Sequence, residues 1–167
     1  MILKDLNELG LAELEMKLEQ CCAATNWYKG LAAKFPFETI EDLKEASNQI
    51  WIACSELDYL EAFHGHPKIG NVDSLAKKFQ ATKGWAGNEQ ELVEQASMDV
   101  IRALSKGNEA YEARFGFIFI VFATGKTAQQ MLDLLLERLP NDREQELEIA
   151  AAEQHKITTL RIQKILA

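Results

Sequence analysis

One short run of strand-like residues stands alone in this sequence, and it limits the folds that the chain can adopt. The run is FGFIFIVFA, in which residues 117–123 combine β-branched and aromatic side chains. No second candidate strand occurs elsewhere, so a strand here would leave its backbone N–H and C=O groups without a pairing partner. We therefore predict an all-α protein, a single-domain helical bundle in which residues 117–123 form one short irregular or extended apolar segment.

The remainder of the chain has apolar residues at the spacing of helices, and its three prolines fall between these periodic segments. Thr39, Asp73 and Thr127 are suitable N-cap residues. Gly107 and Gly116 are suitable helix ends. The pattern predicts helices at residues 11–22, 25–34, 39–63, 73–79, 88–107, 108–116, 127–140 and 142–167.

The composition is that of an ordinary globular protein. The 167 residues, of which 47% are apolar and 26% charged, are most simply one domain over residues 1–167. The net charge of -8 and the lack of a polybasic stripe argue against nucleic acid as a partner. The longest apolar run is too short to span a bilayer, and the N-terminus has acidic residues where a signal peptide would be apolar. We expect a cytoplasmic protein without a membrane partner.

The cysteines support neither a disulfide framework nor a zinc site. Cys21, Cys22 and Cys54 are odd in number, two of them are adjacent, and no C-x-x-C motif occurs. This pattern fits a reducing compartment. We expect no bound metal.

The segment FHGHPKIG holds two of the three histidines at the end of a predicted helix. A residue before proline is disfavoured in the α conformation, so His66 projects from a bend at the end of a rigid element. Histidine is also the usual proton donor or acceptor near neutral pH. His66 is therefore the stronger candidate for chemistry, and His64 the weaker one. The alternative is a helix terminator that happens to contain an exposed imidazole.

Arg161 lies on an apolar stripe of the last predicted helix, four residues from both Ile157 and Ile165. A guanidinium buried there without a partner would cost several kcal/mol. We therefore expect it to be largely buried and to pair with a carboxylate. That carboxylate could belong to a substrate or to a protein side chain. The alternative to a functional role is a structural ion pair or an arginine whose charged end reaches water, and the pattern favours neither interpretation.

Two further motifs carry less weight. Most carboxylates on these helices form the solvated face, and helical spacing singles out neither Glu89 nor Glu94, although Glu89 would lie in the first turn after Asn88. The sequence ATGKT at residues 123–127 ends like a phosphate-binding loop. Position 120 is isoleucine where that loop requires glycine, so we reject this interpretation.

Four motifs together identify a family. The chain has His-Pro at residues 66–67, Glu-Gln at 89–90, Y-x-x-R-F-G-F at 111–117 and K-I-x-x-x-R at 156–161. In order and spacing they resemble the OHCU decarboxylase family, where OHCU is 2-oxo-4-hydroxy-4-carboxy-5-ureidoimidazoline. The resemblance extends over essentially the whole chain.

The resemblance implies a fold, an activity and a site. The family is all-α, usually dimeric and free of cofactors, and it converts OHCU to (S)-allantoin and carbon dioxide during urate degradation. By position, catalytic roles fall to His66, Glu89 and Arg161. Substrate contacts fall to Pro67, Ala86, Gln90, Phe119, Ile120, Val121, Phe122 and Ala123, with the last five offering backbone groups. We therefore expect a homodimer that acts on a small-molecule substrate without a cofactor.

Two departures from the family pattern leave alternatives open. Ala86 stands where the family usually has serine, which removes one hydroxyl contact. The second Glu-Gln pair, at residues 94–95, makes the alignment of Glu89 ambiguous. A non-catalytic helical binding module, or the same fold acting on another ureido or imidazolone acid, also fits the residues.

Overall fold

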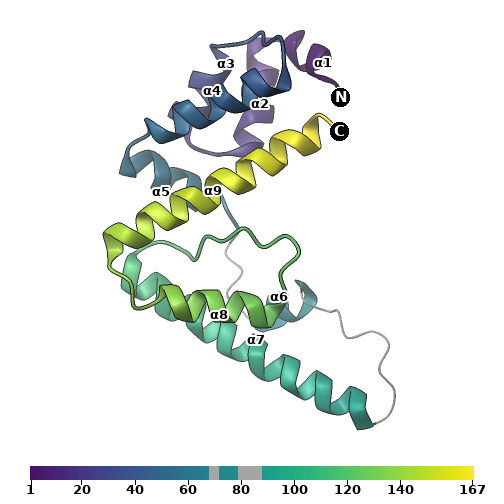
Figure 1. The fold of residues 1–167 in the computed structure, drawn as a ribbon, viewed down its shortest axis with the longest axis vertical. Coiled ribbons are helices and arrows are strands. Elements are labelled where there is room, and N and C mark those ends of the chain that lie inside the picture. Colours follow the sequence, from purple (N-terminus) through teal and green to yellow (C-terminus); the bar gives the residue numbers. More distant parts are fainter. Residues whose placement is uncertain (68–71, 79–87) are drawn as a thin grey trace. The chain divides into compact units, whose positions relative to one another are not determined.

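The computed structural model describes residues 1–67, 72–78 and 88–167, and within these ranges every regular element is a helix (Figure 1). The helices are α1 (Leu3–Asn7), α2 (Leu11–Cys21), α3 (Thr25–Ala32), α4 (Ile40–Ile52), α5 (Glu56–His64), α6 (Val72–Lys78), α7 (Asn88–Phe115), α8 (Ala128–Arg138) and α9 (Arg143–Ile165). Residues 117–123 have no regular secondary structure. The predicted all-α fold with an irregular apolar segment is therefore confirmed.

The chain forms two compact units. Unit 1 comprises residues 1–66, 120–122 and 147–167, and unit 2 comprises residues 67–119 and 123–146. Helix α9 begins in unit 2 and continues into unit 1. That residues 1–167 act as one domain remains a prediction. No helix in the described ranges is long and apolar enough to cross a membrane.

Unit 1 is built around large apolar side chains, and each of its helices contributes at least one. Its fully buried residues include Leu6 of α1, Leu18 of α2, Trp27 and Leu31 of α3, Leu43 of α4, Phe63 of α5 and Ile162 of α9. Burying a side chain of this kind contributes about 1.5–3 kcal/mol. The indole N–H of Trp51 also donates a hydrogen bond to the Ala151 carbonyl oxygen at 2.9 Å, which ties the end of α4 to α9.

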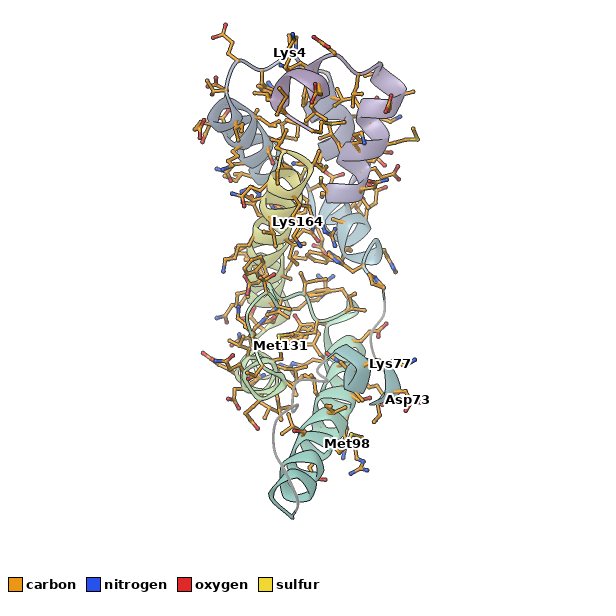
Figure 2. The ribbon with its side chains drawn as sticks, turned by 90° about the vertical axis from the view of Figure 1, so that its right-hand side faces the viewer. Lys4, Asp73, Lys77, Met98, Met131 and Lys164 are labelled. Atoms are coloured by element: carbon orange, nitrogen blue, oxygen red, sulfur yellow. The ribbon has the colours of Figure 1, made fainter. Side chains whose placement is uncertain are left out.

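In unit 2, helix α8 runs alongside α7, and the short helix α6 also packs on α7 (Figures 1 and 2). Met131 of α8 is buried, whereas Asp73 and Lys77 of α6 are exposed (Figure 2). Asp73 was predicted to cap α6, but it lies within the first turn. An acidic side chain there still interacts favourably with the positive end of the helix dipole.

The predicted helix over residues 39–63 is wrong, because the chain breaks it after Ile52. Ser55 starts a new helix, and its side-chain oxygen accepts a hydrogen bond from the Asp58 backbone N–H. The Asp58 carboxylate in turn accepts from the Ser55 N–H at 2.9 Å, which completes a capping box. The predicted caps Thr39 and Thr127 are confirmed, since each accepts from a backbone N–H in the first turn of its helix.

The predicted helix end at Gly107 is also wrong, because α7 continues through it to Phe115. A Cβ atom on Gly107 would lie 2.6 Å from Cδ2 of Leu135, a fully buried residue of α8. This glycine therefore allows two helices to approach closely and does not end one. Gly116 does follow the end of α7, with a positive φ of 79° that only glycine adopts without strain.

Replacing Gly107 with alanine should destabilise the fold even though alanine is the better helix former. We expect Gly107→Ala to lower the free energy of unfolding by about 1–3 kcal/mol, because the new methyl group displaces the buried Leu135 side chain. Gly30→Ala in α3 is the matched control, since the nearest atom to its Cβ would be Cγ2 of Ile50 at 3.6 Å. That control should be stabilising by about 0.5 kcal/mol. Urea denaturation of both variants measures the contrast, and equal effects would contradict it.

Candidate active site

His66 lies just beyond the end of α5, on a bend that is packed tightly against its surroundings. Helix α5 ends at His64, and the His66 backbone N–H donates to the Phe63 carbonyl oxygen at 3.2 Å. A Cβ on Gly65 would come within 2.6 Å of the Ala23 Cβ, so a larger residue would push the bend away from the chain between α2 and α3. The predicted projection of His66 from a bend is confirmed. Its imidazole is half-buried, whereas His64 is exposed.

The His66 ring contacts a buried amide of α9. Its Nε2 lies 2.5 Å from Oε1 of Gln154, a residue only 1% exposed. Burial lowers the pKa of His66 from its usual value of 6.5. The hydrogen bond to Gln154 opposes this lowering, and the positive charge of Arg161 adds to it. The imidazole is therefore neutral near pH 7 and able to accept a proton.

Arg161 lies in the same unit and projects from α9 two turns beyond Gln154. Its Nη1 donates to the backbone oxygens of Gln20 at 3.4 Å and Cys21 at 3.3 Å, at the negative end of α2. The prediction that it is largely buried is wrong, since the side chain is half-buried. In the described ranges it forms no ion pair with a carboxylate. Its remaining N–H groups can therefore bind an anionic or carbonyl oxygen.

The other predicted site residues are divided between the two units, and some lie outside the described residues. Ile120, Val121 and Phe122 belong to unit 1 with His66 and Arg161, and Ile120 is buried. Pro67, Phe119 and Ala123 belong to unit 2, and Pro67 is exposed. Ala86 lies outside the described residues. Glu89 and Gln90 are in the first turn of α7, but their side chains lie outside the description, so their predicted roles remain predictions.

Sequence reasoning missed Gln154 and Thr158, which are buried polar residues of α9. They are 1% and 2% exposed, and the Gln154 side-chain N–H donates to the Thr158 hydroxyl oxygen at 3.1 Å. The signal was present, because residues 154, 158 and 161 share one face of a helix. The residues three and seven positions before Arg161 on the same helix face are Thr158 and Gln154.

The adjacent cysteines do not supply a nucleophile. Burial raises the pKa of both Cys21 and Cys22 to about 11, so the thiols are protonated at neutral pH. Within the part of the chain that the structure describes, no three His, Cys, Asp or Glu residues are arranged to hold a metal ion.

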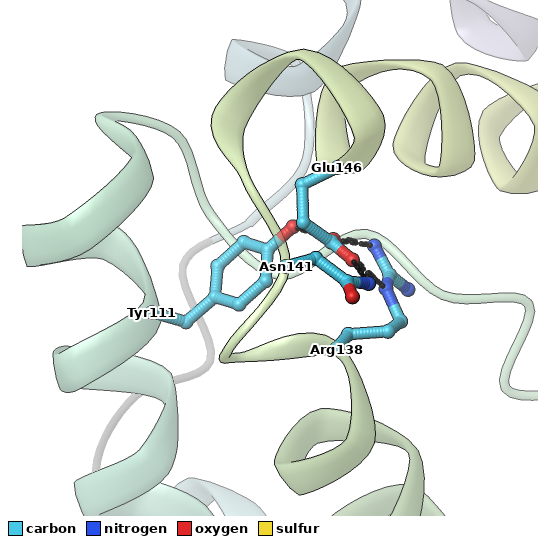
Figure 3. A network of polar contacts seen from close by, with 4 residues as sticks. All are labelled: Tyr111, Arg138, Asn141 and Glu146. Carbon is cyan, nitrogen blue, oxygen red and sulfur yellow. Dashed lines mark hydrogen bonds and ion pairs between the residues drawn. The ribbon is translucent and has the colours of Figure 1, made fainter.

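A second buried polar cluster lies within unit 2 (Figure 3). The Glu146 carboxylate, fully buried at the start of α9, is 2.9 Å from Nη2 of Arg138 and accepts from Asn141 at 3.0 Å. It also accepts from the Tyr111 hydroxyl at 2.5 Å. Burial is the main cause that raises the pKa of Tyr111, and the hydrogen bond to Glu146 is the second. The Arg138 guanidinium lies 4.6 Å from the centre of the Phe119 ring. The cluster thus fixes the start of the irregular segment.

An open groove of about 510 Å³ also lies wholly within unit 2. It is lined by Ala110, Arg114, Leu136, Leu139 and Pro140. Its one charged lining residue, Arg114, donates to the Pro140 and Asn141 carbonyl oxygens. The groove contains no predicted site residue and presents no group suited to acid–base chemistry.

The sequence and the fold of the chain can be compared with those of known proteins. The sequence model described as OHCU decarboxylase matches residues 7–163, so the chain belongs to the OHCU decarboxylase family. The resemblance drawn from the four motifs is therefore confirmed. The chain also resembles the crystal structure of an OHCU decarboxylase in the presence of (S)-allantoin, with a TM-score of 0.72 and 34% identity. The match covers 90% of this chain and 96% of that one.

Curated relatives extend this comparison. The uric acid degradation bifunctional protein TTL of Arabidopsis thaliana is 34% identical over 88% of this chain, and PucL of Bacillus subtilis is 30% identical over 97%. The chain spans only 45% and 32% of the lengths of these two relatives. A decarboxylase of Haloferax volcanii, named for the OHCU reaction, is 23% identical over 76% of this chain and 73% of its own length. A solved (S)-allantoin synthase at 22% identity, with a TM-score of 0.70, supports the fold alone.

Breaking the buried cluster should be costly. Glu146→Gln removes the charged partner that lies 2.9 Å from the buried Arg138 guanidinium, so we expect the free energy of unfolding to fall by about 3–5 kcal/mol. Asp99→Asn is the control, because Asp99 pairs with Arg102 at 3.2 Å on the exposed face of α7. That variant should change stability by about 0.5 kcal/mol or less. Chemical denaturation compares the two, and a similar small loss in both would contradict the structural role of the cluster.

Acid should destabilise the fold through its buried imidazoles. Burial lowers the pKa of both His66 and His155 below 6.5, so between the folded and unfolded pKa values the unfolded chain binds more protons. Their contribution to stability is fully present above about pH 6.5 and is lost as the pH falls through the folded-state pKa. We expect His155→Gln to reduce the loss of stability between about pH 7.5 and about pH 5.5 in urea titrations. An identical pH dependence in the variant and the wild type would contradict this.

Proposed function

We propose that this chain catalyses the decarboxylation of 2-oxo-4-hydroxy-4-carboxy-5-ureidoimidazoline to (S)-allantoin and carbon dioxide, a carbon–carbon lyase step of uric acid degradation. The observation that carries the proposal is that unit 1 of a family member contains both His66 and Arg161, the two proposed catalytic residues whose side chains are described, and that the Arg161 charge contributes to the lowered pKa of His66. The printed names of the relatives, which refer to uric acid degradation and (S)-allantoin, support the choice of substrate and product.

The reaction requires no external electron sink. Carbon dioxide leaves from carbon 4, and the bonding electron pair moves into the adjacent ring C=N bond, whose nitrogen is protonated. The resulting enol loses its hydroxyl proton to become the carbonyl of allantoin. Carbon 5 then accepts a proton on one face, which sets the (S) configuration. The protein must therefore orient the carboxylate, stabilise developing negative charge and move protons.

His66 and Arg161 have the properties that these tasks need. The neutral, half-buried His66 can accept the proton of the 4-hydroxyl group or deliver one to the reacting carbon. Arg161 is anchored by one nitrogen to the end of α2, which leaves its planar fork available for a carboxylate or a developing oxyanion. The α2 carbonyl groups fix the orientation of the guanidinium before substrate binds.

The remaining assignments extend this proposal. Glu89 and Gln90 would bind the ureido N–H groups, and the backbone of residues 119–123 would stabilise oxyanion character. Pro67 and Ala86 would line the substrate. We propose further that the enzyme acts as a homodimer in the cytoplasm without a cofactor.

Changing His66 should abolish stereospecific turnover and spare the fold. We expect His66→Asn to lower kcat/KM by roughly 100-fold or more, because general acid–base catalysis typically contributes that much. His64→Asn, two residues away and exposed, should retain near wild-type activity. The assay adds freshly generated OHCU and follows (S)-allantoin by circular dichroism. Racemic product at the spontaneous rate with the wild type would instead support a non-catalytic binding module.

Arg161 provides an independent test of the same proposal. Arg161→Lys keeps the charge but loses the planar fork, so kcat/KM should fall by roughly ten- to a hundredfold. Arg161→Met should fold comparably but be nearly inactive, since the arginine contributes hydrogen bonds to two carbonyl oxygens and no ion pair in the described ranges. Normal turnover by Arg161→Met, or its failure to fold, would make the residue structural.

A further inference from the structure

The hydrogen bonds around Gln154 determine which way its amide points. The hydroxyl of Thr158 has one proton, and it donates to the Gln154 backbone oxygen at 3.0 Å, while the protonated Cys22 thiol, which also hydrogen-bonds Thr158, can donate to the hydroxyl oxygen. The Thr158 oxygen can then only accept, and it accepts from the Gln154 side-chain N–H at 3.1 Å. The NH₂ group of the amide therefore faces Thr158, and Oε1 faces His66.

The amide orientation in turn determines where the His66 proton resides. Oε1 of Gln154 has no hydrogen, so the 2.5 Å contact with His66 Nε2 requires the proton to be on that ring nitrogen. In a neutral imidazole, Nδ1 then carries the lone pair. A flipped amide would withdraw the Thr158 proton from its backbone acceptor. That exchange would cost the hydrogen bond from the Thr158 hydroxyl to the backbone oxygen, at a site where Gln154 and Thr158 are only 1% and 2% exposed.

We infer that Gln154 is a positioning residue that holds His66 as the Nε2–H tautomer, so that Nδ1 is the nitrogen that exchanges protons with substrate. Thr158 acts one step further away by fixing the amide. The tautomer is inferred from the hydrogen bonds of Gln154, whereas its catalytic use rests on the proposed function. Residue 154 lies outside the four family motifs, and residue 158 is an unspecified position of the last one.

The charged and titratable groups near His66, Gln154 and Thr158 do not change the inferred tautomer. Arg161 of α9 contributes the one resolved charge interaction with His66, and it disfavours the imidazolium. At the end of α2, Cys21 and Cys22 have pKa values of about 11 and stay neutral. On α5, His64 and Glu61 are exposed.

The tautomer can be read directly by nuclear magnetic resonance. Protein labelled with ¹⁵N at histidine, studied without substrate above pH 7, should show the His66 Nε2 as a protonated nitrogen and Nδ1 as an unprotonated one. His64→Asn and His155→Asn variants assign the three ring systems. A protonated Nδ1, or averaging between tautomers, would overturn the inference. This result does not depend on whether the protein acts on OHCU.

Two substitutions at residue 154 test the catalytic use of the tautomer. Gln154→Glu keeps the acceptor and adds negative charge, so it should move the acid limb of the kcat/KM profile to higher pH while retaining the tautomer. Gln154→Met removes the acceptor, so it should move that limb to lower pH and lower kcat by about ten- to a hundredfold, with a smaller change in KM.

A matched control on α9 separates the effect of losing the Gln154 amide from the effect of any glutamine-to-methionine change. Gln163→Met makes the same change at an exposed position of α9 and should leave the pH profile unchanged. A purely structural Gln154 would give unstable variants whose residual activity keeps the wild-type pH profile, and that result would overturn the positioning role. If Gln154→Met fails to fold, the Gln154→Glu profile and the wild-type spectrum decide the matter. Absence of OHCU turnover by the wild type would defeat the proposed function and leave the tautomer standing.

Discussion

The carboxylate of Glu146 is the group on which the packing of unit 2 depends. It is completely buried, and it binds Tyr111 from α7, Arg138 from α8 and Asn141 from the turn before α9. A buried charge is tolerated only when its partners compensate for lost hydration, so the three contacts constrain one another. The same arginine lies over the Phe119 ring, at the start of the irregular segment. One side chain thus fixes how α9 begins and where the segment after α7 is held.

The later turns of helix α9 also carry polar side chains that are stabilised by hydrogen-bond partners. Its first turn carries the structural carboxylate, and its later turns carry Gln154, Thr158 and Arg161 on one face in unit 1. Each of these polar groups has partners: Gln154 and Thr158 bind each other, and Arg161 binds the end of α2. The helix therefore holds two buried polar side chains and one half-buried arginine without leaving them unpaired.

The all-α architecture was predictable because a lone strand has no pairing partner, and the order of the motifs was enough to place the chain in its family. Helix boundaries were less predictable where one residue type serves two purposes. Gly107 resembles a helix end in sequence, but the steric demand that explains it comes from Leu135, which sequence alone does not bring alongside. Ser55 and Asp58 form a capping box inside a stretch whose apolar spacing predicts one continuous helix. The hydrogen bonds of this capping box start a new helix there. The bend at His66 was predictable because the following proline marks it, whereas the buried position of Gln154 was missed because a polar residue on a helix ordinarily faces water.

The reactivity of the two neighbouring thiols at the end of α2 depends on whether this end of the helix stays packed. Cys21 and Cys22 are each 1% exposed, and their pKa values of about 11 keep them unreactive while α2 remains packed. The carbonyl of Cys21 also receives the Arg161 guanidinium, so the backbone that shields these sulfur atoms is the backbone that holds the arginine. The rate at which an alkylating reagent modifies the pair would therefore measure how often this end of α2 separates from α9.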